Sequence, residues 1–270
     1  MKKIFALVLL AVSSLIACHK NAFTGRSQFS LIPESEIQGM AFSQYQQFIS
    51  TNKVLNPANN QNAAMVKRVA ERLITAITQY ATEKGFANEL ANYKWEVNLV
   101  DDKSVNAWCM PGGKIVVYTG ILPVTQNETA LAIVMGHEIV HALAKHGSER
   151  MNQGLIQQFG GMALQAAMAN KPQETQMLFN QAYGIGTTVG VMLPFGRKNE
   201  LEADKFGLMY AALAGYDPRE AINFWRRMSQ VGGGQKPPEF LSTHPSDERR
   251  IADLNAIMPE VLQNYYRPRK

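Results

Sequence analysis

Apolar residues recur at helical spacing along most of the chain and show strand character in one short region. Helical spacing covers residues 34–49 and 61–80, and in the second stretch the apolar residues form one stripe. Three short strand-like runs follow at 94–100, 105–109 and 114–118, with a Pro-Gly-Gly turn between the last two. The remaining helical stretches lie at 128–146, 149–192, 197–214, 218–230 and 246–257. This pattern predicts an α+β domain, mainly helical with a small β-sheet.

The helix predicted after Asn127 is unusually apolar but carries the sequence HExxH from His137 to His141. Asn127 is a plausible cap, and the basic, glycine-containing stretch at 145–147 is expected to end the helix. Histidines four residues apart lie on one helix face, so both imidazoles can reach one metal ion. Glu138 can take a proton from a water there. Such groups are costly to bury without partners, so the pattern indicates a zinc site.

An acidic helix further along the chain is expected to supply a third metal ligand. A catalytic zinc usually has three protein ligands and one open position. Glu200 and Asp204 are four residues apart and share a face of the helix predicted at 197–214. We expect Glu200 to be the third ligand, and Asp204 to accept a hydrogen bond from the second nitrogen of a ligand histidine. Glu202 points elsewhere and is expected at the surface.

His244 is the histidine whose role the sequence leaves open. His146 lies five residues after His141, off the face of the HExxH pair. His244 follows a glycine- and proline-rich stretch, so its loop can move against the cleft. It can donate a hydrogen bond to an oxyanion, act as a removable fourth zinc ligand that keeps the site latent, or simply dock the last helix. Arg250 is expected to be an ion-pair partner near the site.

Residues 1–17 have the pattern of a signal peptide. A charged start and an apolar run lead to Leu15-Ile16-Ala17-Cys18, which resembles a bacterial lipobox. We therefore expect a lipidated N-terminus and tether at 18–33, a single domain at 34–260, and a basic tail at 261–270. The predicted location is the bacterial cell envelope, as a lipoprotein anchored to a membrane and facing the periplasm.

Composition narrows the remaining possibilities. The formal net charge is +5 and the basic residues are scattered, so no nucleic-acid partner is expected. If Cys18 carries lipid, Cys109 has no disulfide partner and is expected to be a small buried hydrophobe.

The methionine- and glycine-rich stretch 149–192 predicts a helical hairpin joined near residues 170–172. It can be either a pair of core helices or a lid or membrane-surface face.

Several further motifs occur in order around these residues. They are NAWCMPGGKI at 106–115, TGIL at 119–122, GYDP at 215–218 and STHPS at 242–246. Together with HExxH and ExxxD they resemble the membrane-associated zinc endopeptidases that include the CAAX prenyl endopeptidase and the HtpX heat-shock protease. The chain is most similar to their soluble-domain branch, over residues 90–258. The resemblance implies a zincin-like fold with zinc on His137, His141 and Glu200 and with Glu138 as the base.

The expected function is zinc-dependent hydrolysis of internal peptide bonds, with one zinc ion per chain. Polypeptide substrates would lie extended along the strand edge near Asn106 and Ala107, because backbone pairing demands little of the sequence. Unfolded or misassembled envelope proteins are the expected substrates. The alternative is a periplasmic chaperone or assembly lipoprotein whose zinc site is latent or regulatory. The choice of zinc over another divalent metal rests on ligand type and on the resemblance.

Overall fold

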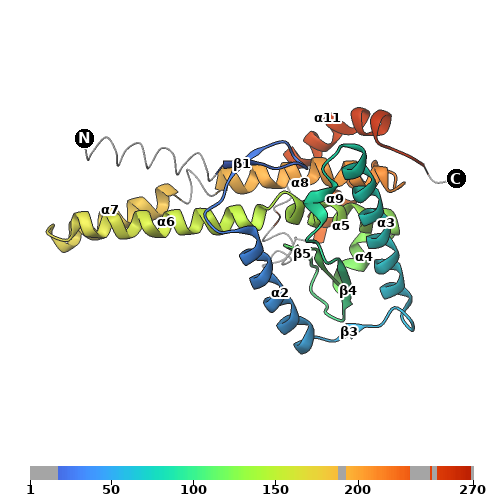
Figure 1. Cartoon of the computed structure of the whole chain (residues 1–270), viewed down its shortest axis with the longest axis horizontal. Helices are drawn as coiled ribbons and strands as arrows, with labels where there is room; N and C mark the ends of the chain where they lie inside the picture. The colour runs from blue at the N-terminus through green and yellow to red at the C-terminus, as the bar shows by residue number, and fades with distance from the viewer. Residues whose placement is uncertain (1–17, 188–192, 232–243, 245–247, 269–270) are drawn as a thin grey trace.

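Helix α5 (Glu128–Leu143) runs through the middle of the molecule and is buried along almost its whole length. This computed structural model describes residues 18–187, 193–231, 244 and 248–268. The Asn127 side chain accepts a hydrogen bond from the Ala130 N–H and so caps the helix, as predicted. A helix that is apolar on every face is a core helix, and Figure 1 shows the other elements arranged around it.

A four-stranded sheet packs beside α5 in the order β3-β4-β6-β5. The strands are β3 (Val54–Leu55), β4 (Glu96–Val100), β5 (Ala107–Met110) and β6 (Lys114–Tyr118). Strands β5 and β6 form an antiparallel hairpin, whereas β4 and β6 are parallel. The turn needs its glycine at Gly113, where φ is +88° and an added Cβ would lie 2.7 Å from the Trp95 ring. The three predicted strands are therefore confirmed, and β5 lies at an edge.

Helices α3 (Gln61–Glu83) and α8 (Leu193–Leu213) pack against α5. The contact between α5 and α8 is unusually close at one point. A Cβ added to Gly136 would lie 2.9 Å from the Gly207 carbonyl oxygen, and one added to Gly207 would lie 2.7 Å from the His137 nitrogen. Glycines at this crossing let the two backbones touch beside His137. The acidic residues of α8 are thereby brought to the HExxH motif.

The remaining helices complete the domain around this pair. Helices α9 (Glu220–Val231) and α11 (Glu248–Asn264) pack on α8 or α5, and α2 (Glu34–Thr51) lies against the sheet. Short helical segments link them: η1 (Ala87–Leu90), η2 (Thr119–Ile121) and α4 (Leu122–Thr125). The mainly helical α+β architecture is confirmed. Helix α11 continues past residue 260, and Val261 is buried in the core.

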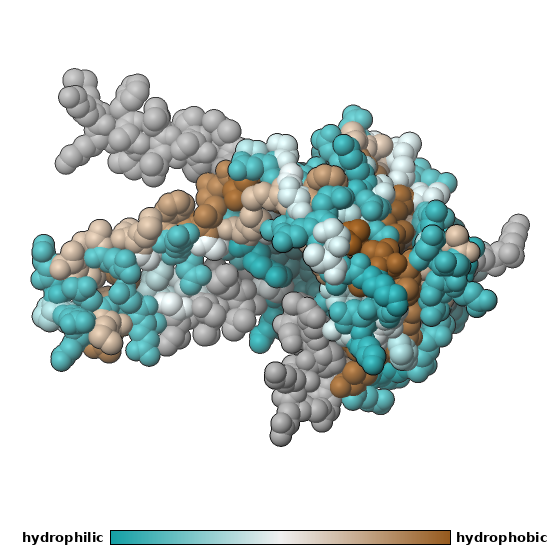
Figure 2. Space-filling model, turned by 90° about the horizontal axis from the view of Figure 1, so that it is seen from below, coloured by the Kyte–Doolittle hydropathy of each residue, from teal (hydrophilic) through white to brown (hydrophobic). Residues whose placement is uncertain are grey.

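Helices α6 (His146–Met168) and α7 (Gln173–Thr187) form an arm that projects from this body (Figure 1). The hairpin is confirmed with its joint at the predicted place, and residues 188–192 lie outside the described part. The reading as core helices is wrong, because large apolar side chains on the arm are exposed, including Phe159 at 57% and Leu178 at 67%. Figure 2 shows the hydrophobic colouring along the arm. Within the described residues, no helix has the length and apolar character required to cross a bilayer.

Two local features differ from the sequence-based expectation. Helix α5 ends at Leu143 and the chain reverses at Lys145, which has φ +56°, so His146 and Gly147 begin α6 instead of ending α5. Residues 18–33, expected to be a tether, contain the paired strands β1 (Cys18–Lys20) and β2 (Ser27–Phe29). The Asn21 amide donates to the Leu143 carbonyl over 2.9 Å, so this hairpin docks on the end of α5.

Candidate metal centre

Two helices and one intervening segment bring four side chains together. His137 and His141 come from α5, Glu200 from α8, and His244 from the chain between α9 and α11. One nitrogen or oxygen from each lies within 4.8 Å of the others. The Nε2 atoms of the α5 histidines are 3.1 Å apart, and each lies 3.4 Å from a Glu200 oxygen. His244 Nδ1 is 2.9 Å from Glu200 Oε2.

The chemistry of this donor set fits a divalent metal ion. Two imidazole nitrogens facing each other at 3.1 Å place lone pairs or protons in conflict, unless a cation or a single proton lies between them. Imidazole and carboxylate together are typical of zinc sites. Glu200 is buried, and the hydrogen bonds from His137 and His244 hold its pKa far below the ordinary value against the effect of burial. The site therefore has a permanently charged carboxylate for a cation.

The protonation of the histidines differs between the two positions on α5. Burial favours neutral His137, but the hydrogen bonds that its ring donates to Asp204 and Glu200 outweigh burial and raise its pKa to about 9. Burial, followed by the neighbouring charge of His137, lowers the pKa of His141 well below its ordinary value. His141 is therefore neutral at pH 7, which is the form that ligates a metal.

Glu138 is a buried carboxylate with one oxygen that no described group satisfies. It is 3% exposed, and its Oε1 accepts no hydrogen bond from the described residues. His244 Nε2 lies 3.6 Å from Oε1. Burial raises the pKa of Glu138, although His244 and His137 oppose the shift. A carboxylate of raised pKa, facing the cluster without a donor, is suited to take a proton from a water.

Asp204 and Arg250 lie directly behind His137. Asp204 Oδ1 is 3.0 Å from His137 Nδ1, so the carboxylate accepts the hydrogen bond that orients the ring. Arg250 donates to both Asp204 oxygens over 2.7 Å, and its guanidinium lies 3.9 Å over the Trp225 ring. The Arg250 charge and hydrogen bond hold the pKa of Asp204 below its ordinary value despite burial. The pair thus remains ionised.

His146 and Glu202 belong to the same network, which corrects the expectation for both. His146 is 1% exposed, and its Nδ1 lies 2.9 Å from His141 Nδ1. Glu202 is not at the surface: its Oε2 lies 2.8 Å from His146 Nε2, and Arg26 Nε donates to both of its oxygens. The offset of five residues placed His146 off the HExxH face only on the assumption of one continuous helix. The reversal at Lys145 breaks that assumption, and a left-handed lysine has no sequence signature.

The edge strand β5 lies beside this cluster and packs on α5. Asn106 and Ala107 are both buried, at 7% and 1% exposure. The Tyr118 N–H donates to the Asn106 carbonyl, so the backbone of Asn106 faces β6. Because strand residues alternate, the backbone groups of Ala107 and Cys109 face outward, where the Ala107 N–H is bonded to the Asn106 side chain. Cys109 is a free thiol, partly buried, with a pKa raised by burial.

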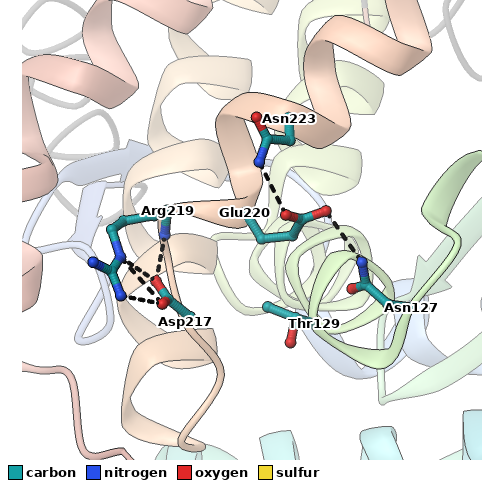
Figure 3. A pocket seen from close by; sticks show the side chains of 6 residues that line it. All are labelled: Asn127, Thr129, Asp217, Arg219, Glu220 and Asn223. Carbon is teal, nitrogen blue, oxygen red and sulfur yellow. Dashed lines mark hydrogen bonds and ion pairs between the residues drawn. The ribbon is translucent and has the colours of Figure 1, made fainter.

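A separate pocket lies at the N-terminal end of α5 (Figure 3). It is lined by Asn127, Thr129, Asp217, Arg219, Glu220 and Asn223. Glu220 accepts hydrogen bonds from Asn127 and Asn223 across it, and Arg219 binds Asp217. His137 is ten residues further along the chain, roughly 15 Å along the helix axis. The pocket is therefore not part of the metal centre.

Comparison with known proteins shows which peptidases this chain is similar to. The sequence matches the family model for peptidase family M48 over residues 60–258. It is 31% identical to the mitochondrial metalloendopeptidase OMA1 of Homo sapiens over 247 residues, covering 89% of this chain and 46% of that protein. The OMA1 of Schizosaccharomyces pombe is 32% identical over 206 residues, covering 76% and 56%. The β-barrel assembly-enhancing protease of Escherichia coli is 32% identical over 181 residues, covering 62% and 36%.

These comparisons correct the predicted location. Relatives from fungi, a plant and human are mitochondrial by name, which contradicts a bacterial lipoprotein facing the periplasm. A charged start followed by an apolar run is a targeting signal recognised by transport machinery. Its composition alone does not determine to which membrane the protein is delivered. The lipidation of Cys18 stays a prediction. The chain spans about half or less of the length of these three relatives.

Proposed function

The chain belongs to peptidase family M48, and from this premise we propose that it is a zinc-dependent endopeptidase that hydrolyses internal peptide bonds of polypeptides. The observation that carries the proposal is the convergence of His137, His141 and Glu200 beside the unsatisfied carboxylate of Glu138. The similarity to the OMA1 and β-barrel assembly-enhancing proteases supports the proposal, because both are named as proteases.

The metal ligands in this proposal are His137 and His141 through Nε2, and Glu200 through its carboxylate. A bound zinc ion supplies Lewis acidity, which lowers the pKa of a water to about 7 and polarises a carbonyl. Asp204 holds His137 in the tautomer that leaves Nε2 free, because it accepts the Nδ1 proton over 3.0 Å. The close approach of α5 and α8 at Gly136 and Gly207 keeps the ligands of both helices in register.

Glu138 is the proposed general base and then the general acid. Its carboxylate receives a proton from the attacking water and passes it to the nitrogen of the leaving amine. Burial keeps this carboxylate away from solvent donors and raises its pKa, so it takes the proton more readily. General acid–base catalysis of this kind contributes about 10²- to 10⁴-fold to a rate.

His244 has two proposed roles, and one substitution separates them. Its Nδ1 lies 2.9 Å from Glu200 and its Nε2 3.6 Å from Glu138, so it reaches both the ligand set and the base. As an oxyanion donor it would stabilise the tetrahedral intermediate, and His244→Ala would lower the cleavage rate. As a fourth ligand it would close the site, and His244→Ala would raise the rate.

The substrate is proposed to pair with β5 as an added strand. The outward carbonyl of Ala107 and the outward backbone groups of Cys109 can bond an extended polypeptide, while Asn106 holds the inner side to β6. This mode reads the backbone and demands little of the side chains. It suits unfolded or misassembled proteins at a membrane, which is the substrate class we propose.

The test is cleavage of casein by the purified chain, by Glu138→Gln and by the control Glu71→Gln. Glu71 is an exposed carboxylate on α3. The expected result is chelator-sensitive cleavage by the wild type and the control, and a loss of about 10²-fold or more in Glu138→Gln with zinc still bound. Cleavage that survives both the chelator and Glu138→Gln would contradict the proposal.

A second candidate function is a chaperone or assembly factor whose metal site is latent. The four-residue cluster favours it, because His244 supplies the fourth donor that closed structural sites have. In that case zinc would bind, casein would stay intact in the wild type and in His244→Ala, and the protein would suppress aggregation of an unfolded client.

A further inference from the structure

The inference concerns what holds His141, and it rests on the metal site proposed above. The two ring nitrogens of His141 face opposite sides. Its Nε2 faces the cluster, 3.1 Å from His137 Nε2, and its Nδ1 faces away, 2.9 Å from His146 Nδ1. A neutral imidazole has one N–H and one lone pair. For Nε2 to offer its lone pair to a metal, the proton must therefore be on Nδ1.

His146 is placed to accept that proton. Its Nε2 lies 2.8 Å from Glu202 Oε2, and a carboxylate only accepts, so this nitrogen carries the hydrogen. Neutral His146 then has its lone pair on Nδ1, facing His141. The donors and acceptors agree in one direction only: His141 donates to His146, and His146 donates to Glu202.

Glu202, at the far end of this series of hydrogen bonds, is held by residues distant in sequence. Arg26 Nε lies 3.1 Å from Glu202 Oε2, and the Arg26 Nη atoms donate to both oxygens of Glu149 over 2.6 Å. Arg26 lies between β1 and β2, and this hairpin docks on the end of α5 through Asn21. The left-handed turn at Lys145 returns the chain so that His146 lies against His141.

We propose that His146 is a positioning residue: it fixes the tautomer and ring orientation of His141, and so strengthens metal binding. On the other side of the site, Asp204 does this for His137 by direct contact. Here an imidazole is inserted between the ligand and the carboxylate. Removal of such an outer partner typically weakens metal affinity about 10- to 100-fold.

The test compares zinc affinity, by competition with a chelator, in the wild type and three variants. His146→Leu removes the acceptor. His146→Asn keeps one, because its Oδ1 occupies nearly the position of Nδ1. His19→Leu replaces an exposed histidine of β1 as the control. We expect His146→Leu to bind zinc about tenfold or more weakly, His146→Asn to recover most of the loss, and His19→Leu to match the wild type.

A spectroscopic readout reports the tautomer directly. In the zinc-loaded wild type, the His141 Nδ1 proton should give a resolved NMR signal protected from exchange with water. We expect this signal to persist in His146→Asn and to be lost in His146→Leu. Denaturant unfolding of the metal-free variants checks that each one folds.

Three outcomes separate the claims. Equal zinc affinity in the wild type and His146→Leu, with the proton retained, would overturn this inference alone. Equal losses in His146→Leu and His146→Asn would assign the effect to packing and would also overturn it. A wild type that binds no zinc would overturn the proposed function as well.

Discussion

The two histidines of α5 are each supported by a carboxylate and an arginine, but at different depths. Behind His137, Asp204 contacts the ring directly and Arg250 holds it, with side chains 6% and 4% exposed. Behind His141, Glu202 acts through His146, and it and Arg26 are 11% and 14% exposed. We call these the inner pair (Asp204–Arg250) and the outer pair (Glu202–Arg26).

The two pairs connect the site to different parts of the chain. The inner pair joins α8 to α11, two helices that pack on each other. The outer pair joins α8 to the β1–β2 hairpin, far away in sequence. Because buried charges depend more strongly on their partners than exposed ones, the two pairs should differ in how much stability is lost when either is broken.

Breaking the inner pair should have the largest effect. Arg250→Gln removes the guanidinium that binds both oxygens of the buried Asp204 carboxylate, which we expect to lower the free energy of unfolding by about 3–5 kcal/mol. The measurement is urea unfolding of the metal-free chain. The adjacent Arg249→Gln is the control, since Arg249 is 75% exposed and meets Asp253 only at 3.8 Å. A loss below about 1 kcal/mol in Arg250→Gln would remove the distinction between the pairs.

Breaking the outer pair should cost less. Arg26→Gln removes charge-assisted hydrogen bonds to Glu149 and Glu202 that are partly open to solvent, and we expect a loss of about 1.5–3 kcal/mol. The same unfolding measurement applies, with exposed Lys20→Gln in the same hairpin as control. If Arg26→Gln were as damaging as Arg250→Gln, depth would not be what separates the two pairs.

The pair that Glu220 forms with Arg227 gives a reference away from the site. Arg227 lies 2.9 Å from Glu220, and its hydrogen bond, with those of Asn223 and Asn127, holds the pKa of Glu220 below its ordinary 4.5 despite partial burial. A carboxyl group whose pKa is lower in the folded state stabilises the folded state at pH values above its unfolded pKa. This stabilisation is lost as the pH falls through the folded pKa. Glu220→Gln should therefore cost about 0.2–1 kcal/mol at pH 7.

This cost should shrink as the pH falls from about 4.5, where the unfolded chain takes up the proton, through the lower pKa of the folded carboxylate. Unfolding of both proteins at a series of pH values measures it. The exposed Glu260→Gln is the control. A difference that stays constant down to the lowest pH would show that Glu220 stabilises by packing and not by its charge.

The arm should be the least sensitive region. Met177 and Leu178 on α7 are 65% and 67% exposed, so they bury little apolar surface. Replacement of both by glutamine should change the free energy of unfolding by less than about 0.5 kcal/mol. A large loss would mean that the arm is covered by something in solution, which a change in molecular mass would reveal.

Most of the fold followed from the sequence because its signals are local. The period of the apolar residues identified the helices and the strands, and the four-residue spacings in HExxH and ExxxD predicted which side chains share a helix face. Gly136 and Gly207, by contrast, contribute nothing to either spacing. Their role is visible only where α5 and α8 cross.

The outer pair could not be predicted, for a physical reason. Its geometry depends on Lys145, which has a left-handed backbone conformation that lysine rarely adopts. It also depends on a hairpin, β1–β2, of two three-residue strands, too short for alternation to show. His146 and Glu202 therefore looked like a helix end and a solvated face.

The most direct test of the account is the zinc content of the purified chain by native mass spectrometry. The wild type and Glu138→Gln should each carry one zinc ion, because Glu138 is the base and not a ligand. His141→Ala should carry none, because it removes a donor from the cluster. No zinc in the wild type, even after zinc is supplied, would contradict the account, as would a full complement in His141→Ala.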